Sequence, residues 1–120
     1  MAVECTFVEK KKYFHLKFQG KLSVEDYKVF VPQIDAATKK YGEISLLMEL
    51  VDFHGWTLGA SWEDAKFGFK HITDIKRIAV LGDETWEKGL SFLLKLFTFA
   101  AVRYFPLHEK QEAKKWIESA

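Results

Sequence analysis

Four side chains that could bind a metal ion or transfer protons follow apolar runs of the chain: Asp52, His54, Asp83 and His108. The carboxyl ends of parallel strands share one edge of a sheet, and ligands of open α/β proteins bind there. Carboxylates and imidazoles gathered at that edge would suit a metal ion or acid–base chemistry. Their spacing follows no ligand or catalytic pattern, however, and no phosphate-binding, nucleophile-elbow, HExxH or CxxC motif occurs. We therefore predict no catalytic residue, no metal and no cofactor, and an enzyme using Asp52, His54 and Asp83 stays an unsupported alternative.

The segment 51–56, VDFHGW, is a second candidate site. It brings an acid, two aromatic side chains, a histidine and a glycine together directly after the apolar run 44–50. We predict a loop here, at the carboxyl end of a central strand. Trp56 would flank the same edge as Trp86, either as a lid over the core or as the wall of a pocket for a flat or apolar ligand.

The segment 84–100 predicts a helix with more apolar surface than a sheet can cover. One apolar stripe at helical spacing comprises Trp86, Leu90, Leu93, Leu94 and Phe97, and a second stripe comprises Phe92, Leu96 and Phe99. Together they occupy roughly two thirds of the circumference, whereas a surface helix needs a stripe of about 100°. The second stripe therefore predicts a contact with a neighbouring helix, with a dimer partner, or with a lipid or membrane surface.

From these two segments we predict a ligand site and a separate apolar face. The ligand-binding residues expected are Phe53, His54, Trp56, Trp86, Leu90, Leu93 and Phe97. The membrane or dimer face expected is formed by Phe92, Leu96 and Phe99.

The first half of the chain predicts an edge hairpin and a helix. Strands at 4–9 and 13–19 flank a lysine turn, and alternation in the second strand predicts one covered face, with His15 outward and solvated. Ser23 opens a helix with Asp26 three residues later, as in a capping box, and Gly42 ends it. Pro32 predicts a kink or a restart of that helix.

The second half alternates strands and helices. The apolar run 44–50 predicts a buried central strand, followed by a helix over 57–71, a strand over 77–81, the helix 84–100, a strand over 102–105 and a helix over 108–118. The order ββαβαβαβα predicts one α/β domain over 1–120, with a mostly parallel sheet, an antiparallel edge strand and helices packed on it.

Composition excludes several classes of function. The 18 basic and 17 acidic residues leave a net charge of +1, so we predict no nucleic-acid partner. A single cysteine, Cys5, and the lack of a signal peptide or a long apolar span favour a cytoplasmic protein with a structural thiol. Peripheral membrane association remains part of the lipid hypothesis. Lys10, Lys11 and Lys12 predict a solvated turn, with contact to anionic lipid as the alternative.

Four segments together resemble the SpoIIAA-like family, a STAS-like fold related to the bacterial anti-sigma-factor antagonists. They are DFHGW after the central strand, RIAVLGD before a tryptophan-bearing helix, RYF before the last helix, and EAKKW near its end. The resemblance implies a phosphorylatable hydroxyl at the start of the helix after the central strand, where Thr57 is nearest and Ser61 lies one turn later. It also implies lipid or small-ligand binding, as in related proteins of this fold group.

Two functional hypotheses follow from these observations. The first is a non-enzymatic module that binds a lipid-like ligand or a membrane surface through the helix 84–100. The second is a protein-interaction regulator controlled by phosphorylation of Thr57 or Ser61, with a helix N-cap as the alternative role of Thr57. A homodimer that uses the second apolar stripe is compatible with both.

Overall fold

The computed structural model describes residues 3–56, 75–82 and 101–119, with the side chains of all but 21, 22, 24, 27 and 53–56. The predicted helices over 57–71 and 84–100 lie outside these residues. The described elements are β1 (Val3–Val8), β2 (Tyr13–Leu22), α1 (Val24–Tyr41), β3 (Ile44–Trp56), β4 (Ile75–Leu81), β5 (Ala101–Phe105), the short 3₁₀ helix η1 (Leu107–Glu109) and α4 (Lys110–Glu118).

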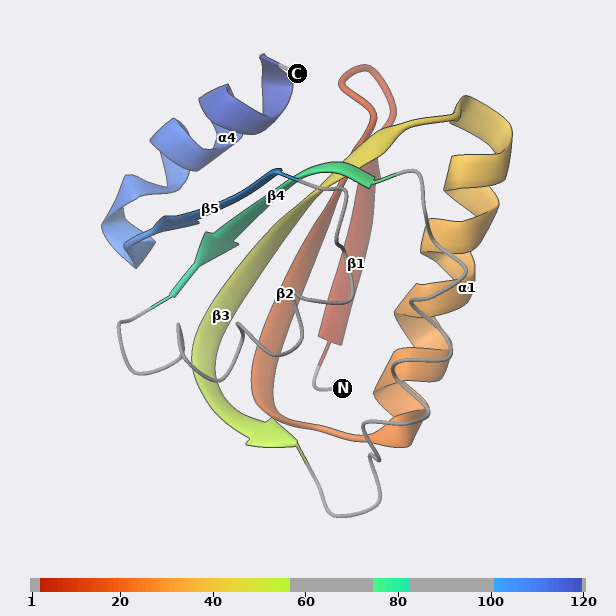
Figure 1. Cartoon of the computed structure of the whole chain (residues 1–120). Helices are drawn as coiled ribbons and strands as arrows, with labels where there is room; N and C mark the ends of the chain where they lie inside the picture. The colour runs from red at the N-terminus through yellow and green to blue at the C-terminus, as the bar shows by residue number, and fades with distance from the viewer. Residues whose placement is uncertain (1–2, 57–74, 83–100, 120) are drawn as a thin grey trace.

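The described strands form one sheet in the order β1-β2-β3-β4-β5 (Figure 1). β1 pairs with β2 in antiparallel fashion, and each following pair is parallel. Figure 1 shows α1 on one face of this sheet and α4 on the other. The predicted α/β class, with a mostly parallel sheet and one antiparallel edge strand, is confirmed.

The helix α1 begins as the sequence predicts. Ser23 accepts a hydrogen bond from the backbone of Asp26, whose carboxylate accepts one from the backbone of Ser23, so the capping box is complete. Gly42, with φ of 80°, follows the last turn and donates its N–H to the carbonyl of Thr38. A positive φ favours glycine because it has no side chain to clash.

The predicted restart at Pro32 is wrong, because α1 runs continuously from Val24 to Tyr41. Pro32 is exposed on the outer face of the helix. There the carbonyl that loses its partner, four residues earlier at the exposed Lys28, is open to water. The inner face, which carries Phe30 and Ile34, stays packed on the sheet and keeps the helix in one piece.

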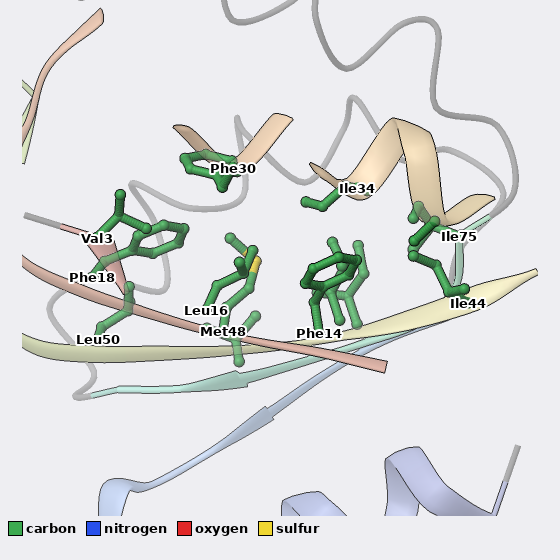
Figure 2. Packing of buried hydrophobic residues seen from close by; sticks show 14 residues of the cluster. Val3, Phe14, Leu16, Phe18, Phe30, Ile34, Ile44, Met48, Leu50 and Ile75 are labelled. Carbon is green, nitrogen blue, oxygen red and sulfur yellow. The ribbon is translucent and has the colours of Figure 1, made fainter. Parts of the chain in front are cut away.

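Two apolar clusters hold the layers together. Figure 2 shows the larger one, in which Phe30 and Ile34 of α1 face strand side chains such as Phe14, Leu16 and Met48. Side chains alternate between faces along a strand, so the intervening residues meet α4 on the other side. That second cluster comprises Tyr13, Leu47, Ala79, Leu81, Phe105, Ala113 and Ile117.

The second cluster corrects the expectation that only one face of β2 is covered. Tyr13 belongs to the alternation predicted to face solvent, yet it is buried. Its ring packs in the α4 cluster and its hydroxyl donates to Oε2 of Glu118 at 3.4 Å. The last helix therefore covers the start of β2, a contact between distant parts of the chain. On α4 itself, Ala113 and Ile117 are buried in this cluster and Trp116 is partly buried against it.

The loop predicted at 51–56 is wrong, because β3 continues to Trp56. β2 extends beside it to Leu22 and supplies the pairing partners that a loop would lack. Gln19 pairs with Val51 and Gly20 with Phe53, so Asp52 is an extra residue in the ladder, with φ of 47°. Extra residues of this kind bend a strand, and Figure 1 shows β3 strongly curved.

Candidate functional site

The carboxyl ends of β3, β4 and β5 form the edge where the sequence predicts a site. The backbone N–H of Gly82 donates to the carbonyl of Phe105 at 3.1 Å and joins the ends of β4 and β5. β3 extends beyond this junction, because Glu49 pairs with Leu81 and seven more residues of β3 follow. The bent end of β3 is therefore the most protruding part of the described edge.

The structure places only two of the four predicted acid and imidazole residues. Asp52 is exposed at the bulge of β3, and His108 is exposed in η1. The side chain of His54 and all of Asp83 lie outside the described part of the chain. Within that part, no three His, Cys, Asp or Glu side chains come together in a way that would hold a metal ion.

A different polar group lies just below this edge, on the α4 side of the sheet. Oε1 of Glu49 is 2.7 Å from Nε2 of His15 and 3.2 Å from Nζ of Lys110. The Glu49 side chain is 13% exposed, against 23% for His15 and 38% for Lys110. These three residues, from β2, β3 and α4, are called the Glu49 cluster below.

The prediction that His15 is a solvated side chain is therefore wrong. His15 faces away from α1, as its place in the alternation requires, but the diagonal neighbour Glu49 binds its ring. Residues on one face of paired strands lie close enough for such side chains to meet. The signal in the sequence was Glu49 itself, one acid in an apolar strand, since a carboxylate inside a sheet needs partners of opposite charge or hydrogen-bond donors.

The electrostatics of the Glu49 cluster follow from its partners. Burial by itself would raise the pKa of Glu49, but hydrogen bonds from His15 and Lys110 and the charge of Lys110 outweigh it, so the pKa is lowered. The carboxylate is ionised at neutral pH and already bound by two donors. The cluster is thus suited to fixing α4 on the sheet and to offering a polar surface, rather than to accepting a proton.

A groove of about 560 Å³ lies between β5 and α4, beside the same edge. Its walls carry both charges, with Arg103 over the ring of Phe105 at 5.0 Å and Lys115 paired with Glu112 at 3.7 Å. The remaining lining residues are Tyr104, Glu109 and Trp116. β5 is the last strand of the described sheet, and the groove beside it is lined by polar and aromatic side chains.

Cys5 packs against the α1 cluster and is half-buried. Burial raises the pKa of its thiol to about 11. Because the thiolate is the reactive form, Cys5 is protonated and inert at neutral pH. This agrees with the predicted structural role.

The other predicted site residues are outside what the structure describes. They are the side chains of Phe53, His54 and Trp56, and the residues Thr57, Ser61, Trp86, Leu90, Phe92, Leu93, Leu96, Phe97 and Phe99. Among the described helices, none is long and apolar enough to cross a membrane.

The family and structure comparisons both indicate a SpoIIAA-like fold. The family model described as SpoIIAA-like matches residues 13–118. The chain is similar to the crystal structure of an uncharacterised protein with a SpoIIAA-like fold from Shewanella loihica PV-4, with 27% identity, a TM-score of 0.71, and coverage of 97% of this chain and 92% of that one. No curated protein matches it.

A second solved structure is the phosphorylated form of the Bacillus cell fate determinant SpoIIAA. It is 11% identical, with a TM-score of 0.57 and coverage of 97% of this chain and 99% of that one. At this identity the similarity establishes a shared fold.

Proposed function

The chain belongs to the SpoIIAA-like family, and we propose that it is a non-enzymatic regulator that binds a protein partner, as an anti-sigma-factor antagonist does. The observation that carries the proposal is the end of β3. This central strand protrudes beyond β4, bends at Asp52 and ends at Trp56, so Thr57 is the next residue of the chain. The groove between β5 and α4 lies at the same edge and adds contact surface.

Phosphorylation of Thr57 or Ser61 would control this edge. The family resemblance implies a modified hydroxyl after the central strand, and a structure of the Bacillus determinant of the same fold is of its phosphorylated form, which supports the proposal. A phosphate adds a charge of about −1.5 to −2 at neutral pH. Such a charge would add to that of the exposed carboxylate of Asp52, five residues before Thr57 in the chain, and would repel an acidic partner and attract a basic one.

Phosphate on Thr57 or Ser61 is the expected result when the chain is purified from its own host. Intact-mass and peptide mass spectrometry would detect it, and alanine at the modified position should remove it completely. Ser119→Ala is the matched control, because Ser119 is an exposed hydroxyl at the far end of α4. The proposal also requires Thr57→Glu and Thr57→Ala to differ in their affinity for the partner. Unmodified hydroxyls in every growth phase, with equal affinities for both variants, would refute it.

A second candidate is a module for a lipid-like ligand or a membrane surface, and the apolar periodicity of 84–100 favours it. In this alternative Phe53, His54 and Trp56 would join Trp86, Leu90, Leu93 and Phe97 around the ligand. Phe92, Leu96 and Phe99 would contact lipid or a second copy of the chain. The members of this set within 86–99 belong to two stripes of one helix in the sequence pattern.

Flotation with anionic and neutral liposomes, beside light scattering, would separate these alternatives. The test variant is Phe92→Glu with Phe99→Glu, and the control is Ser91→Glu with Thr98→Glu, which adds the same charge to the polar face of the same predicted helix. Lipid binding lost only in the test variant would support the membrane reading. A dimer that becomes a monomer only in the test variant would make the stripe a subunit interface. Absence of both effects would exclude the stripe from either role.

A further inference from the structure

A polar pocket of about 270 Å³ lies at the amino ends of the parallel strands, opposite the edge that leads to Thr57. Figure 1 shows the β1–β2 turn, the start of β3 and the end of α4 at this end of the molecule. The volume is about twenty times what one water molecule needs. The pocket is lined chiefly by Lys11, Lys12, Tyr41, Glu43, Ser45 and Lys76, over the buried Ile117. It is called the amino-end pocket below.

The charge of the amino-end pocket is positive. Three ammonium groups, from Lys11, Lys12 and Lys76, face one carboxylate, from Glu43. The structure shows no ion pair for any of these three lysines within its described residues. Uncompensated cations around a concave surface attract anions.

The amino-end pocket also contains a buried hydroxyl, that of Ser45. Ser45 lines the pocket, is 4% exposed and has no hydrogen-bond partner for its side chain among the residues that the structure describes. Because protein groups leave this hydroxyl unpaired in the described part of the chain, it is available to hydrogen-bond whatever occupies the pocket. An oxyanion bound in the pocket would accept that hydrogen bond in place of water.

The backbone holds these groups in place. The turn residue Lys12 adopts φ of 54°, and its carbonyl accepts a hydrogen bond from the backbone N–H of Ser45 at 3.1 Å. Lys76 belongs to an irregular step of the β3–β4 ladder, where Ile44 pairs with Ile75 but Leu46 pairs with Ile78. The backbone of a turn and of a bulge therefore fixes the positions from which the exposed side chains of Lys11, Lys12 and Lys76 extend.

Compensation of helix dipoles does not account for these lysines. The C-terminal end of α1 carries partial negative charge here, and cations in the last turn offset it. Lys39 and Lys40 already occupy that last turn. The pocket lysines come instead from the β1–β2 turn and from β4.

We propose that the amino-end pocket binds a phosphate monoester, with Lys11, Lys12 and Lys76 balancing its charge and Ser45 donating a hydrogen bond to a phosphate oxygen. A monoester carries about two negative charges at neutral pH, which matches three ammonium groups less one carboxylate. Either a soluble phosphorylated metabolite or the head group of a phosphatidic acid could present this group. The pocket is independent of phosphorylation at Thr57, since it lies at the other end of the sheet.

Calorimetric titration with glycerol phosphate, beside flotation with phosphatidylcholine vesicles that do or do not contain phosphatidic acid, tests the proposal. Binding of glycerol phosphate alone identifies a soluble ligand, and binding of phosphatidic acid vesicles alone identifies a lipid head group. Either result, or both, supports phosphate binding in the amino-end pocket if the double variant Lys11→Gln/Lys76→Gln binds about tenfold or more weakly than the wild type. Lys10→Gln with Lys40→Gln is the matched control, because it removes two nearby charges outside the pocket. Equal weakening by both double variants, or no binding to either probe, would overturn the proposal.

Ser45→Ala provides a readout besides affinity. Without ligand its melting temperature should equal or exceed that of the wild type, because alanine removes a buried hydroxyl that has no partner among the described residues. Affinity for the phosphate should fall about tenfold, since a hydrogen bond to a charged group is lost. A lower melting temperature with unchanged affinity would show that the hydroxyl is satisfied within the fold and would remove Ser45 from the site.

Discussion

Alanine in place of Phe30 should lower the free energy of unfolding by about 3–5 kcal/mol. Phe30 is 1% exposed, and its ring centroid is 5.4 Å from that of Phe18 on β2. The substitution removes a ring from the centre of the contact between α1 and the sheet, and the surrounding strands cannot close the cavity. A domain of this size has a total stability of about 5–15 kcal/mol, so the variant would be close to unfolding at ambient temperature.

Urea unfolding followed by circular dichroism would measure this loss. Gln33→Ala is the matched control, because Gln33 lies on the exposed side of the same helix and its side chain donates to the carbonyl of Val29, one turn earlier. A surface change of this kind should alter stability by about 0.5 kcal/mol or less. A loss below about 1 kcal/mol for Phe30→Ala would mean that α1 does not pack on the sheet as described.

Local patterns were sufficient to predict the sheet and the layer that α1 forms on one face of it. The alternation of Phe14, Leu16 and Phe18 fixes which face of β2 meets α1, and the capping box at Ser23 fixes where α1 begins. Both signals depend only on neighbours in the sequence, so the sequence alone carries them. The parallel order of β2, β3 and β4 follows because each is separated from the next by enough chain for a crossover.

The end of β3 could not be predicted in the same way. Asp, His and Gly within 51–56 are typical of a loop, yet the segment pairs with β2 as far as Trp56. Whether such residues form a strand depends on whether a partner strand extends beside them, which is a property of the assembled sheet. Here Gly20 and Asp52 both take positive φ angles, and the ladder continues through the irregular step.

The charged sites were missed for a related reason. Glu49 receives its partners from β2 and α4, and the amino-end pocket collects lysines from a turn and from a bulge in β4. No spacing rule connects residues so far apart in the chain. The lone acid at Glu49 and the serine at the start of an apolar strand, Ser45, were the available signals, since each places a polar group where burial is expected.

Glutamine in place of Glu49 should lower the free energy of unfolding by about 1–3 kcal/mol at neutral pH, because hydrogen bonds to a charged group are lost. The carboxylate accepts from His15 at 2.7 Å and from Lys110 at 3.2 Å, and it is 13% exposed. The variant keeps the shape of the side chain but removes the charge that both donors face. Chemical unfolding of both proteins over a range of pH would measure the difference.

The pH dependence of that difference identifies its cause. In the folded protein the pKa of Glu49 lies below its ordinary value of 4.5. Its contribution is therefore fully present above about pH 4.5 and is lost as the pH falls through the lowered pKa. Wild type and Glu49→Gln should differ at pH 7 and converge in acid, whereas Glu112→Gln, which changes an exposed pair on α4, should show little difference at either pH. A gap that stays constant into acid would assign the effect of Glu49 to packing and would contradict the electrostatic account of how α4 is held on the sheet.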